Sequence, residues 1–316
     1  MTGDTARSFA GVMALTAPLF LLVFVGYALS RWGHWPKVVS EALTRFVFAV
    51  AIPAFLFRLM SDFSRLPPVD ARLLIAYFGG CLATFAAARF VAARAFRMDG
   101  TGQSIFGVGT VFSNLVLLGI PLAKVTLGDA ALPSVSLLVV FNSLLLWTLV
   151  TVSIEWARNR DLSLPGIAKT ARGVIANPVV AGILLGTIFG FSGLPLPAMI
   201  GDTLSLMSQA AVPMSLIVLG MGLAEYGTRE GLRESLALGA FKLFALPLAV
   251  WLIARALGLP VVETQAVVVM ASLPVGANVY LMARQFGALE GPVAASLVLT
   301  TAISAVTTPL LLTLLR

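Results

Sequence analysis

The stretch VFSNLVLLGIPLAKVTLG, residues 111–128, places polar and helix-breaking residues inside an otherwise apolar segment. Ser113 and Asn114 are followed by Gly119 and Pro121. Proline has no N–H group and its ring clashes with the preceding turn, so backbone carbonyls near residue 117 lose their helical partners. Asn114 adds a side-chain amide with both donors and an acceptor. In a membrane, such a cluster is tolerated only inside protein or beside a water-filled cavity, so we predict a binding site here.

A second stretch, SLPVGANVY at residues 272–280, repeats the theme with Pro274, Gly276 and Asn278. If both stretches interrupt helices near the middle of a membrane, the new helix starts point toward a common place. Helix N-termini carry partial positive charge and attract carboxylates. The alternative is that proline and glycine only kink these helices, but the pairing of the two stretches favours a binding site.

Four further residues are candidates beside the two stretches. Asn142 lies within an apolar segment, where its amide either joins helices by hydrogen bonds or contributes to binding. Lys242 is a cation at depth, and three roles stay open for it: reaching the membrane surface with its long side chain, balancing an anionic ligand, or binding the carbonyl end of a broken helix. Pro53 and Pro213 are expected to line the apolar wall of the site.

The elements that must position these residues are membrane-spanning helices. Of 316 residues, 59% are hydrophobic and 11% are charged, against about 25% charged in soluble domains. Apolar segments of about 20 residues match the thickness of a bilayer core. The sequence predicts an all-α polytopic membrane protein with ten such segments, at 11–31, 38–60, 71–93, 104–127, 131–156, 172–191, 199–223, 235–257, 263–287 and 291–315.

The segments divide into two halves that resemble each other. Ala51-Ile52-Pro53 corresponds to Ala211-Val212-Pro213, and the two interrupted stretches take matching places, in the fourth and ninth segments. Because each half has an odd number of crossings, the second half is inverted, which is a recurring plan of secondary transporters. We predict a first repeat at 1–157, a cytoplasmic linker at 158–171 and a second repeat at 172–316.

The net charge is +7, and the distribution of the positive residues indicates the orientation of the chain in the membrane rather than nucleic-acid binding. With the N-terminus outside, twelve Lys and Arg residues face the cytoplasm and seven face the other side. Excess positive charge marks the cytoplasmic side, so we expect both termini in the periplasm of a bacterial inner membrane. The single cysteine, Cys81, and the single histidine, His34, leave no metal or catalytic cluster. No catalytic or nucleotide-binding motif is present, so we predict no cofactor and no enzyme.

Three longer motifs resemble the auxin efflux carrier family, which includes plant PIN auxin carriers and bacterial malonate and malate permeases. They are ANPVVAGILLGTIFGFSGLPLP, AVPMSLIVLGMGL and SLPVGANVYLMARQFG, and FSNLVLLGIPLAKVTLG is similar to that family's first broken helix. The resemblance covers nearly the whole chain. Two departures, the short linker and the missing threonine in Asn177-Pro178-Val179-Val180, point to a short bacterial organic-anion permease.

The resemblance implies a ten-helix inverted repeat. The first, second, sixth and seventh segments would form a scaffold that makes a homodimer, and the others a mobile unit that moves as an elevator. Asn114 and Pro121 would belong to one crossing helix, and Pro274, Gly276 and Asn278 to the other. We therefore expect a secondary transporter of small organic anions such as malonate, malate or auxin-like acids. A sodium-coupled symporter of the bile-acid type and a non-transporting membrane sensor are the alternatives.

Overall fold

The computed structural model describes residues 2–61, 70–159, 178–225 and 231–315, and the regular elements in these ranges are helices. Within these ranges, six helical segments are long and apolar enough to cross a membrane. They are Phe9–Arg31, Lys37–Ser61, Arg72–Arg94, Ala198–Leu223, Leu232–Ala256 and Glu290–Leu314. An all-helical membrane protein is therefore confirmed. The count of ten crossings and the internal repeat stay predictions.

The helices follow the predicted segments closely. Those without an internal change of winding are α1 (Thr2–Arg31), α4 (Arg72–Arg94), α7 (Leu132–Asn159), α9 (Pro178–Phe191), α10 (Ala198–Leu223) and α15 (Glu290–Leu314). The predicted segment 104–127 consists of α5 (Gly100–Val111), η3 (Leu115–Gly119) and α6 (Ile120–Thr126), and η4 (Asp129–Ala131) follows it. The predicted segment 263–287 consists of α13 (Val261–Ala271) and α14 (Asn278–Phe286). The predicted linker 158–171, except for the last two residues of α7, lies outside the described residues, as does the beginning of the segment 172–191.

In the described part of the chain, three stretches of five residues, each just before a proline, wind in the wider π form. Because proline lacks an N–H group, the carbonyl four residues earlier has no regular partner, and a π turn is one way to rearrange the hydrogen bonds around it. The three sites are η1 (Val47–Ala51) between α2 (Lys37–Phe46) and α3 (Ile52–Ser61), η3 before Pro121, and η5 (Phe241–Ala245) between α11 (Leu232–Ala240) and α12 (Leu246–Ala256).

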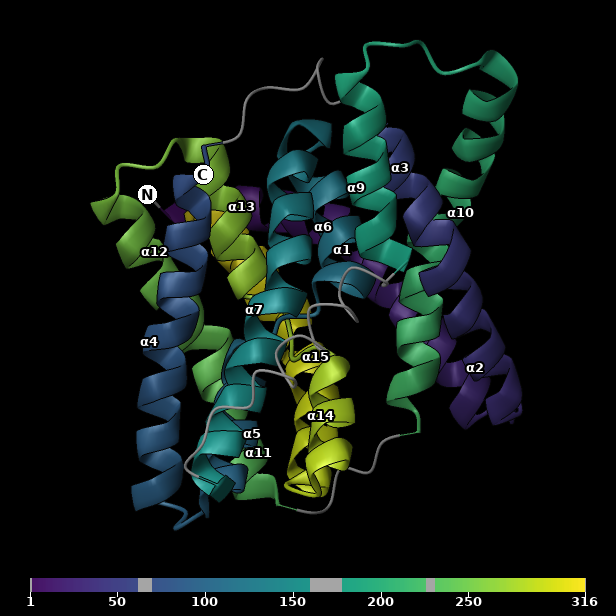
Figure 1. Ribbon diagram of the computed structural model, residues 1–316. Coiled ribbons are helices and arrows are strands. Elements are labelled where there is room, and N and C mark those ends of the chain that lie inside the picture. Colours follow the sequence, from purple (N-terminus) through teal and green to yellow (C-terminus); the bar gives the residue numbers. More distant parts are fainter. Residues whose placement is uncertain (1, 62–69, 160–177, 226–230, 316) are drawn as a thin grey trace.

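Contacts between helices fall mainly into two groups. In one, α3 packs on α9 and α10, and α1 packs on α10. In the other, α4 packs on α5 and α12, α7 packs on α5, and α11 packs on α15. The groups meet where α1 contacts α15 and α6, and where α10 contacts η3. Figure 1 shows α5 and α14 toward one end of the molecule and α6 and α13 toward the other, with both chain termini at the latter end.

Glycines bring helices of the first group into close contact. A Cβ atom at Gly182 would lie 2.6 Å from the carbonyl oxygen of Pro53, and one at Gly186 would lie 2.6 Å from that of Phe57. Only glycine leaves room for such backbone approach, as in small-residue packing of membrane helices. The glycine pattern of α9 therefore serves to pack it on α3.

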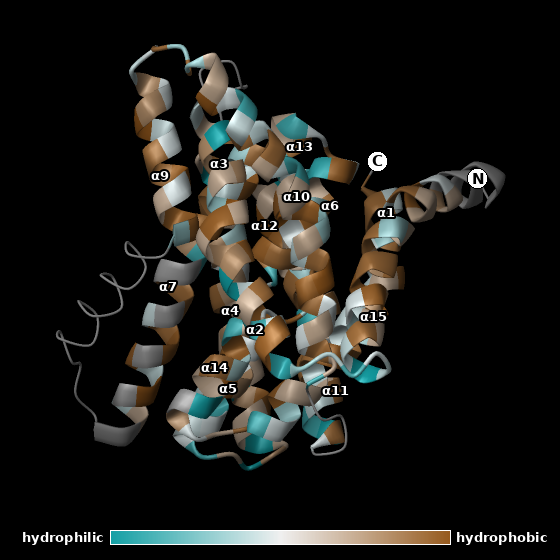
Figure 2. Cartoon of the chain, turned by 90° about the vertical axis from the view of Figure 1, so that its right-hand side faces the viewer, coloured by the Kyte–Doolittle hydropathy of each residue, from teal (hydrophilic) through white to brown (hydrophobic). Residues whose placement is uncertain are grey.

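Large apolar side chains cover the outside of the helices. Leu21, Phe24, Phe90 and Ile188 are each more than half exposed. Figure 2 shows apolar residues along the helical walls, with hydrophilic residues gathered at the two ends. In water such an apolar surface would promote aggregation, whereas the hydrocarbon of a membrane solvates it.

Candidate functional site

The two interrupted helices are joined to each other by their backbones. Asn114 N–H donates to the Pro274 carbonyl oxygen at 3.0 Å, and Gly276 N–H donates to the Phe112 carbonyl oxygen at 2.8 Å. Ser113 and Val275 form an isolated antiparallel bridge between these bonds. Each break thus supplies the hydrogen-bond partners that the other lost, which is the condition for non-helical backbone at membrane depth.

Side chains from other helices hold the crossing in place. The Tyr77 hydroxyl of α4 donates to Ser113 Oγ at 3.1 Å. Val275 N–H donates to Thr300 Oγ1 of α15 at 3.1 Å. Both breaks are therefore fixed from outside as well as to each other.

One carbonyl that the sequence predicts to lose its partner is bound by a neighbouring helix. Pro121 lacks the N–H group that would reach Leu117 in a regular α-helix. The Ser215 hydroxyl, from α10, instead lies 3.2 Å from the Leu117 carbonyl oxygen and 2.8 Å from that of Val212. This contact is one place where the two helix groups meet.

The predicted glycines and Pro121 shape the crossing. A Cβ atom at Gly276 would lie 3.0 Å from Phe112 Cδ1 and 3.1 Å from the Ser113 carbonyl oxygen. One at Gly119 would lie 2.8 Å from Leu273 Cδ1. Pro121 is buried in the first turn of α6. Gly276 therefore permits close approach of the two breaks, and Gly119 permits η3 to pack on the second one.

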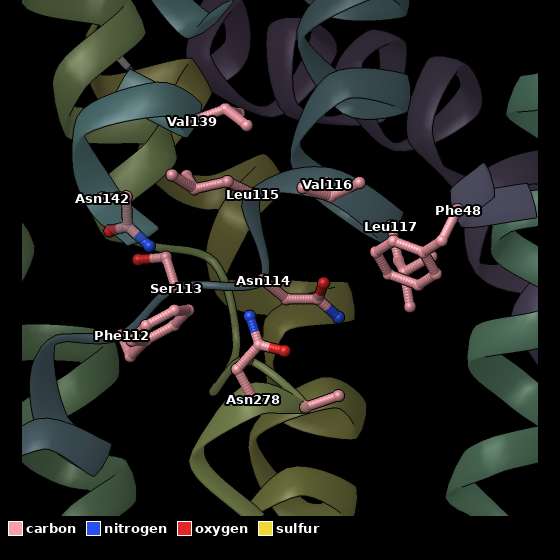
Figure 3. A pocket seen from close by; sticks show the side chains of 12 residues that line it. Phe48, Phe112, Ser113, Asn114, Leu115, Val116, Leu117, Val139, Asn142 and Asn278 are labelled. Carbon is pink, nitrogen blue, oxygen red and sulfur yellow. The ribbon is translucent and has the colours of Figure 1, made fainter. Parts of the chain in front are cut away.

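A small cavity of about 40 Å³ lies at the crossing. Figure 3 shows that the side chains of Asn114, Asn142 and Asn278 come to it from three different parts of the chain: the break before η3, helix α7 and the start of α14. Asn114 is 6% exposed and Asn142 is 3% exposed. The other lining residues are Phe48, Phe112, Ser113, Leu115, Val116, Leu117, Val139, Gly276 and Ala277. Since a water needs roughly 10–15 Å³ measured in this way, the cavity has room for a few waters or one small polar group.

One polar atom of this cavity has no partner. Asn142 Oδ1 is buried and accepts no hydrogen bond from the described residues. A buried polar group without a partner costs about 1–3 kcal/mol, so Asn142 Oδ1 is an acceptor that a water or a ligand in the cavity would satisfy. The amide can be turned by 180° to present its N–H₂ group instead.

Helix ends give the site its polarity. The segment Leu115–Thr126 and helix α14 both start at residues of the cavity wall or directly beside them, and their partial positive charges face it. The C-terminal end of α13 carries partial negative charge, and a lysine binds it. Lys242 is fully buried, and its Nζ donates to the carbonyl oxygen of Ala271, the last residue of α13, at 2.6 Å. Of the three roles left open for Lys242, this geometry is that of binding a broken helix's carbonyl end.

The predicted residues are distributed unevenly around the site. Ser113, Asn114, Asn142, Gly276 and Asn278 line the cavity, whereas Gly119, Pro121 and Pro274 support it from behind. Pro53 and Pro213 are not among the lining residues.

Phe48, in η1, is the residue that the first helix group contributes to the wall. The sequence reasoning missed Phe48, Tyr77 and Thr300. A hydroxyl in an apolar segment was a usable signal for the last two, but a phenylalanine among many gives none.

Comparison with known proteins identifies the family. The sequence model of the family described as "Membrane transport protein" matches residues 11–312. The chain belongs to this family. It is the auxin efflux carrier family that the sequence motifs resemble, and the match runs over nearly the whole chain.

Three relatives of this chain have transporter names. A protein of Rhizobium meliloti described as "Putative malonate transporter" is 25% identical over 311 residues, 97% of each chain. An uncharacterized transporter of Methanocaldococcus jannaschii is 24% identical over 271 residues, 81% of this chain and 83% of the relative. Another, of Methanothermobacter thermautotrophicus, is 25% identical over 268 residues, 84% of this chain and 86% of the relative. The chain is therefore similar to membrane transporters over most of its length.

Among the residues that the structure describes, no three His, Cys, Asp or Glu side chains gather as ligands for a metal ion. The polar groups of the crossing are instead amides, hydroxyls and backbone groups. Such groups donate and accept hydrogen bonds.

Proposed function

We propose that this membrane transport protein is a secondary carrier of small carboxylates, with its binding site at the crossing of the two interrupted helices. The observation that carries the proposal is the cavity where three asparagine amides and two helix starts converge. N–H donors and positive helix ends together suit a carboxylate better than a cation or an apolar molecule. The malonate named in the relative from Rhizobium meliloti is an acid of this class.

The size of the cavity supports a small acid. With a volume of about 40 Å³, it accommodates a carboxylate group but little beyond it. The N–H₂ groups of Asn114 and Asn278 would hold the carboxylate, and Asn142 would either add its own N–H₂ group or accept from a hydroxyl or water. Phe48, Phe112 and Val139 would exclude bulk water and strengthen these bonds.

The two helix groups support an elevator mechanism. The cavity lies at their boundary: Phe48 comes from one group, and the crossing helices and Asn142 come from the other. Sliding of the second group past the first would carry the bound carboxylate across the membrane without opening the crossing. In this proposal the first group is the scaffold and the homodimer interface, both termini are periplasmic, and the membrane is the bacterial inner membrane.

The test is Asn114→Ala, measured as malonate flux in proteoliposomes. We expect flux to fall at least tenfold while the purified variant melts as the wild type does, because Asn114's backbone bond to Pro274 does not need the side chain. Gln103→Ala is the matched control: it also removes an amide, but Gln103 bonds to the Met98 carbonyl oxygen at 2.8 Å and lies outside the cavity. Unchanged flux in Asn114→Ala would remove Asn114 from the site.

Sodium-coupled transport is the second candidate function. The observation that favours it is Asn142 Oδ1, which has no hydrogen-bond partner among the described residues. An amide oxygen is a suitable ligand for a hard cation. Replacing sodium by choline on both sides of the vesicle decides the question, since a coupled carrier stops and an uncoupled one continues.

A further inference from the structure

A second and larger cavity adjoins the crossing. Its volume is about 460 Å³, and it shares Phe48, Leu117, Ala277 and Asn278 with the small cavity. Its other walls come from α2, from the end of α10 and from the rest of α14. We call this cavity the vestibule. A ligand that leaves the crossing past Asn278 enters it.

The vestibule contains two arginines that are free to bind an anion. Lys37 Nζ lies 3.8 Å from a Glu41 carboxylate oxygen and 3.6 Å from a Glu225 one, so both acids of the vestibule face the same lysine. Arg45 and Arg284 also line the vestibule, and both are exposed. Within the described part of the chain, neither arginine forms an ion pair. The acids therefore leave both guanidinium groups available.

The spacing places the arginines outward from the amides. Arg284 follows Asn278 by six residues on α14, which corresponds to about 9 Å along a helix. Arg45 precedes Phe48 by three residues, which corresponds to roughly 5 Å. An anion between the guanidinium groups would thus lie one step outside the crossing, still within the vestibule.

The arginines belong to different helix groups. Arg45 is on α2, which packs on α10, whereas Arg284 is on α14, which packs on α5 and α15. Any sliding of one group past the other would separate them. In the arrangement seen here, in which the crossing and the vestibule adjoin, the two arginines line one shared cavity.

We propose that Arg45 and Arg284 form an outer carboxylate site, which captures the transported acid in the vestibule and delivers it to the amides at the crossing. The proposal rests on the function proposed above. Guanidinium groups bind carboxylates with paired N–H donors, and exposed arginines attract anions over a distance that salt shortens. Such a site raises the rate of capture more than the final affinity, and its contribution decreases with ionic strength.

The experiment compares Arg45→Gln/Arg284→Gln with the wild type in equilibrium exchange of radiolabelled malonate. Equal concentrations on both sides make the orientation of the protein in the vesicle irrelevant, and phosphatidylcholine vesicles supply no anionic headgroup to compete. We expect the half-saturating concentration to rise about tenfold at low salt and to approach the wild-type value at high salt. The maximal rate stays the same, because the crossing is untouched.

Two control variants separate the site from general charge effects. Arg94→Gln/Arg97→Gln removes the same charge from exposed residues at and just beyond the end of α4, outside the vestibule, and should behave as the wild type. Arg45→Lys/Arg284→Lys keeps the charge and should retain the salt dependence. Melting temperatures of the purified variants verify folding.

The outcomes distinguish this inference from the function on which it rests. Wild-type exchange with an unchanged half-saturating concentration in Arg45→Gln/Arg284→Gln would overturn the outer site and leave the carrier function standing. An equal effect in Arg94→Gln/Arg97→Gln would also overturn it, since the cause would be net charge. No exchange of carboxylates by the wild type would instead overturn the carrier function.

Discussion

Replacement of Gly276 by alanine tests whether the two breaks must touch. The new Cβ atom would lie 3.0 Å from Phe112 Cδ1, 3.1 Å from the Ser113 carbonyl oxygen and 3.3 Å from that of Phe112. These distances are below ordinary van der Waals contact, so the neighbours must shift by a few tenths of an ångström. The shift acts directly on the hydrogen bond from Gly276 N–H to the Phe112 carbonyl oxygen, which is 2.8 Å long.

The expected loss of stability follows from these contacts. Overpacking costs about 1–3 kcal/mol, and weakening a backbone hydrogen bond adds about 0.5–1.5 kcal/mol. We expect a net loss of about 2 kcal/mol. The melting temperature falls by roughly 2–4 °C for each kcal/mol in domains of about 150–250 residues and by less in longer chains, so a decrease of about 3 °C is expected for these 316 residues. Malonate flux should fall as well, because Asn114 and Asn278 move apart.

The assay is thermal unfolding of the purified protein in detergent, together with flux in proteoliposomes. Gly11→Ala is the matched control, because Gly11 lies in α1 with no heavy atom within 4 Å of the new Cβ atom. It should melt at or slightly above the wild-type temperature, since alanine favours a helix. Wild-type melting and flux in Gly276→Ala would refute the close contact of the two breaks.

The remaining predictions concern the supports of the crossing. Lys242→Met removes the donor to the Ala271 carbonyl oxygen and should cost about 1–3 kcal/mol, seen as a lower melting temperature; an unchanged one would show that α13 does not need this bond. Gly220→Ala places a Cβ atom 1.8 Å from the Val23 carbonyl oxygen, so α1 and α10 must separate. We expect a loss of about 3 kcal/mol, larger than at Gly276, and the opposite order of melting temperatures would contradict this packing.

Much of the fold follows from the hydropathy of the sequence and from the positions of its prolines. Apolar segments of membrane length predict helices because an apolar environment leaves the backbone only its own hydrogen bonds. The breaks near Pro121 and Pro274 were predictable for the same reason, since proline removes a donor that nothing nearby replaces. The π turns before Pro53 and Pro247 were not predicted, because a proline in a helix can equally give a simple kink.

Residues of the candidate site could be predicted where a polar side chain stands among apolar neighbours, and could not be predicted where the residue is apolar like its neighbours. Asn114, Asn142 and Asn278 are conspicuous among apolar neighbours, and all three line the cavity. Phe48 gives no signal, since its place depends on how two helix groups meet, and no local pattern encodes that meeting. The role of Lys242 likewise needed the position of Ala271, 29 residues away.

Whether a carboxylate binds at the crossing is decided most directly by an experimentally determined structure of the protein with malonate. The account predicts density for one carboxylate group of the acid in the cavity of the crossing, within hydrogen-bond distance of the Asn114 and Asn278 amides. Density confined to the vestibule or to the lipid-facing surface, with the cavity at the crossing filled only by water, would contradict it.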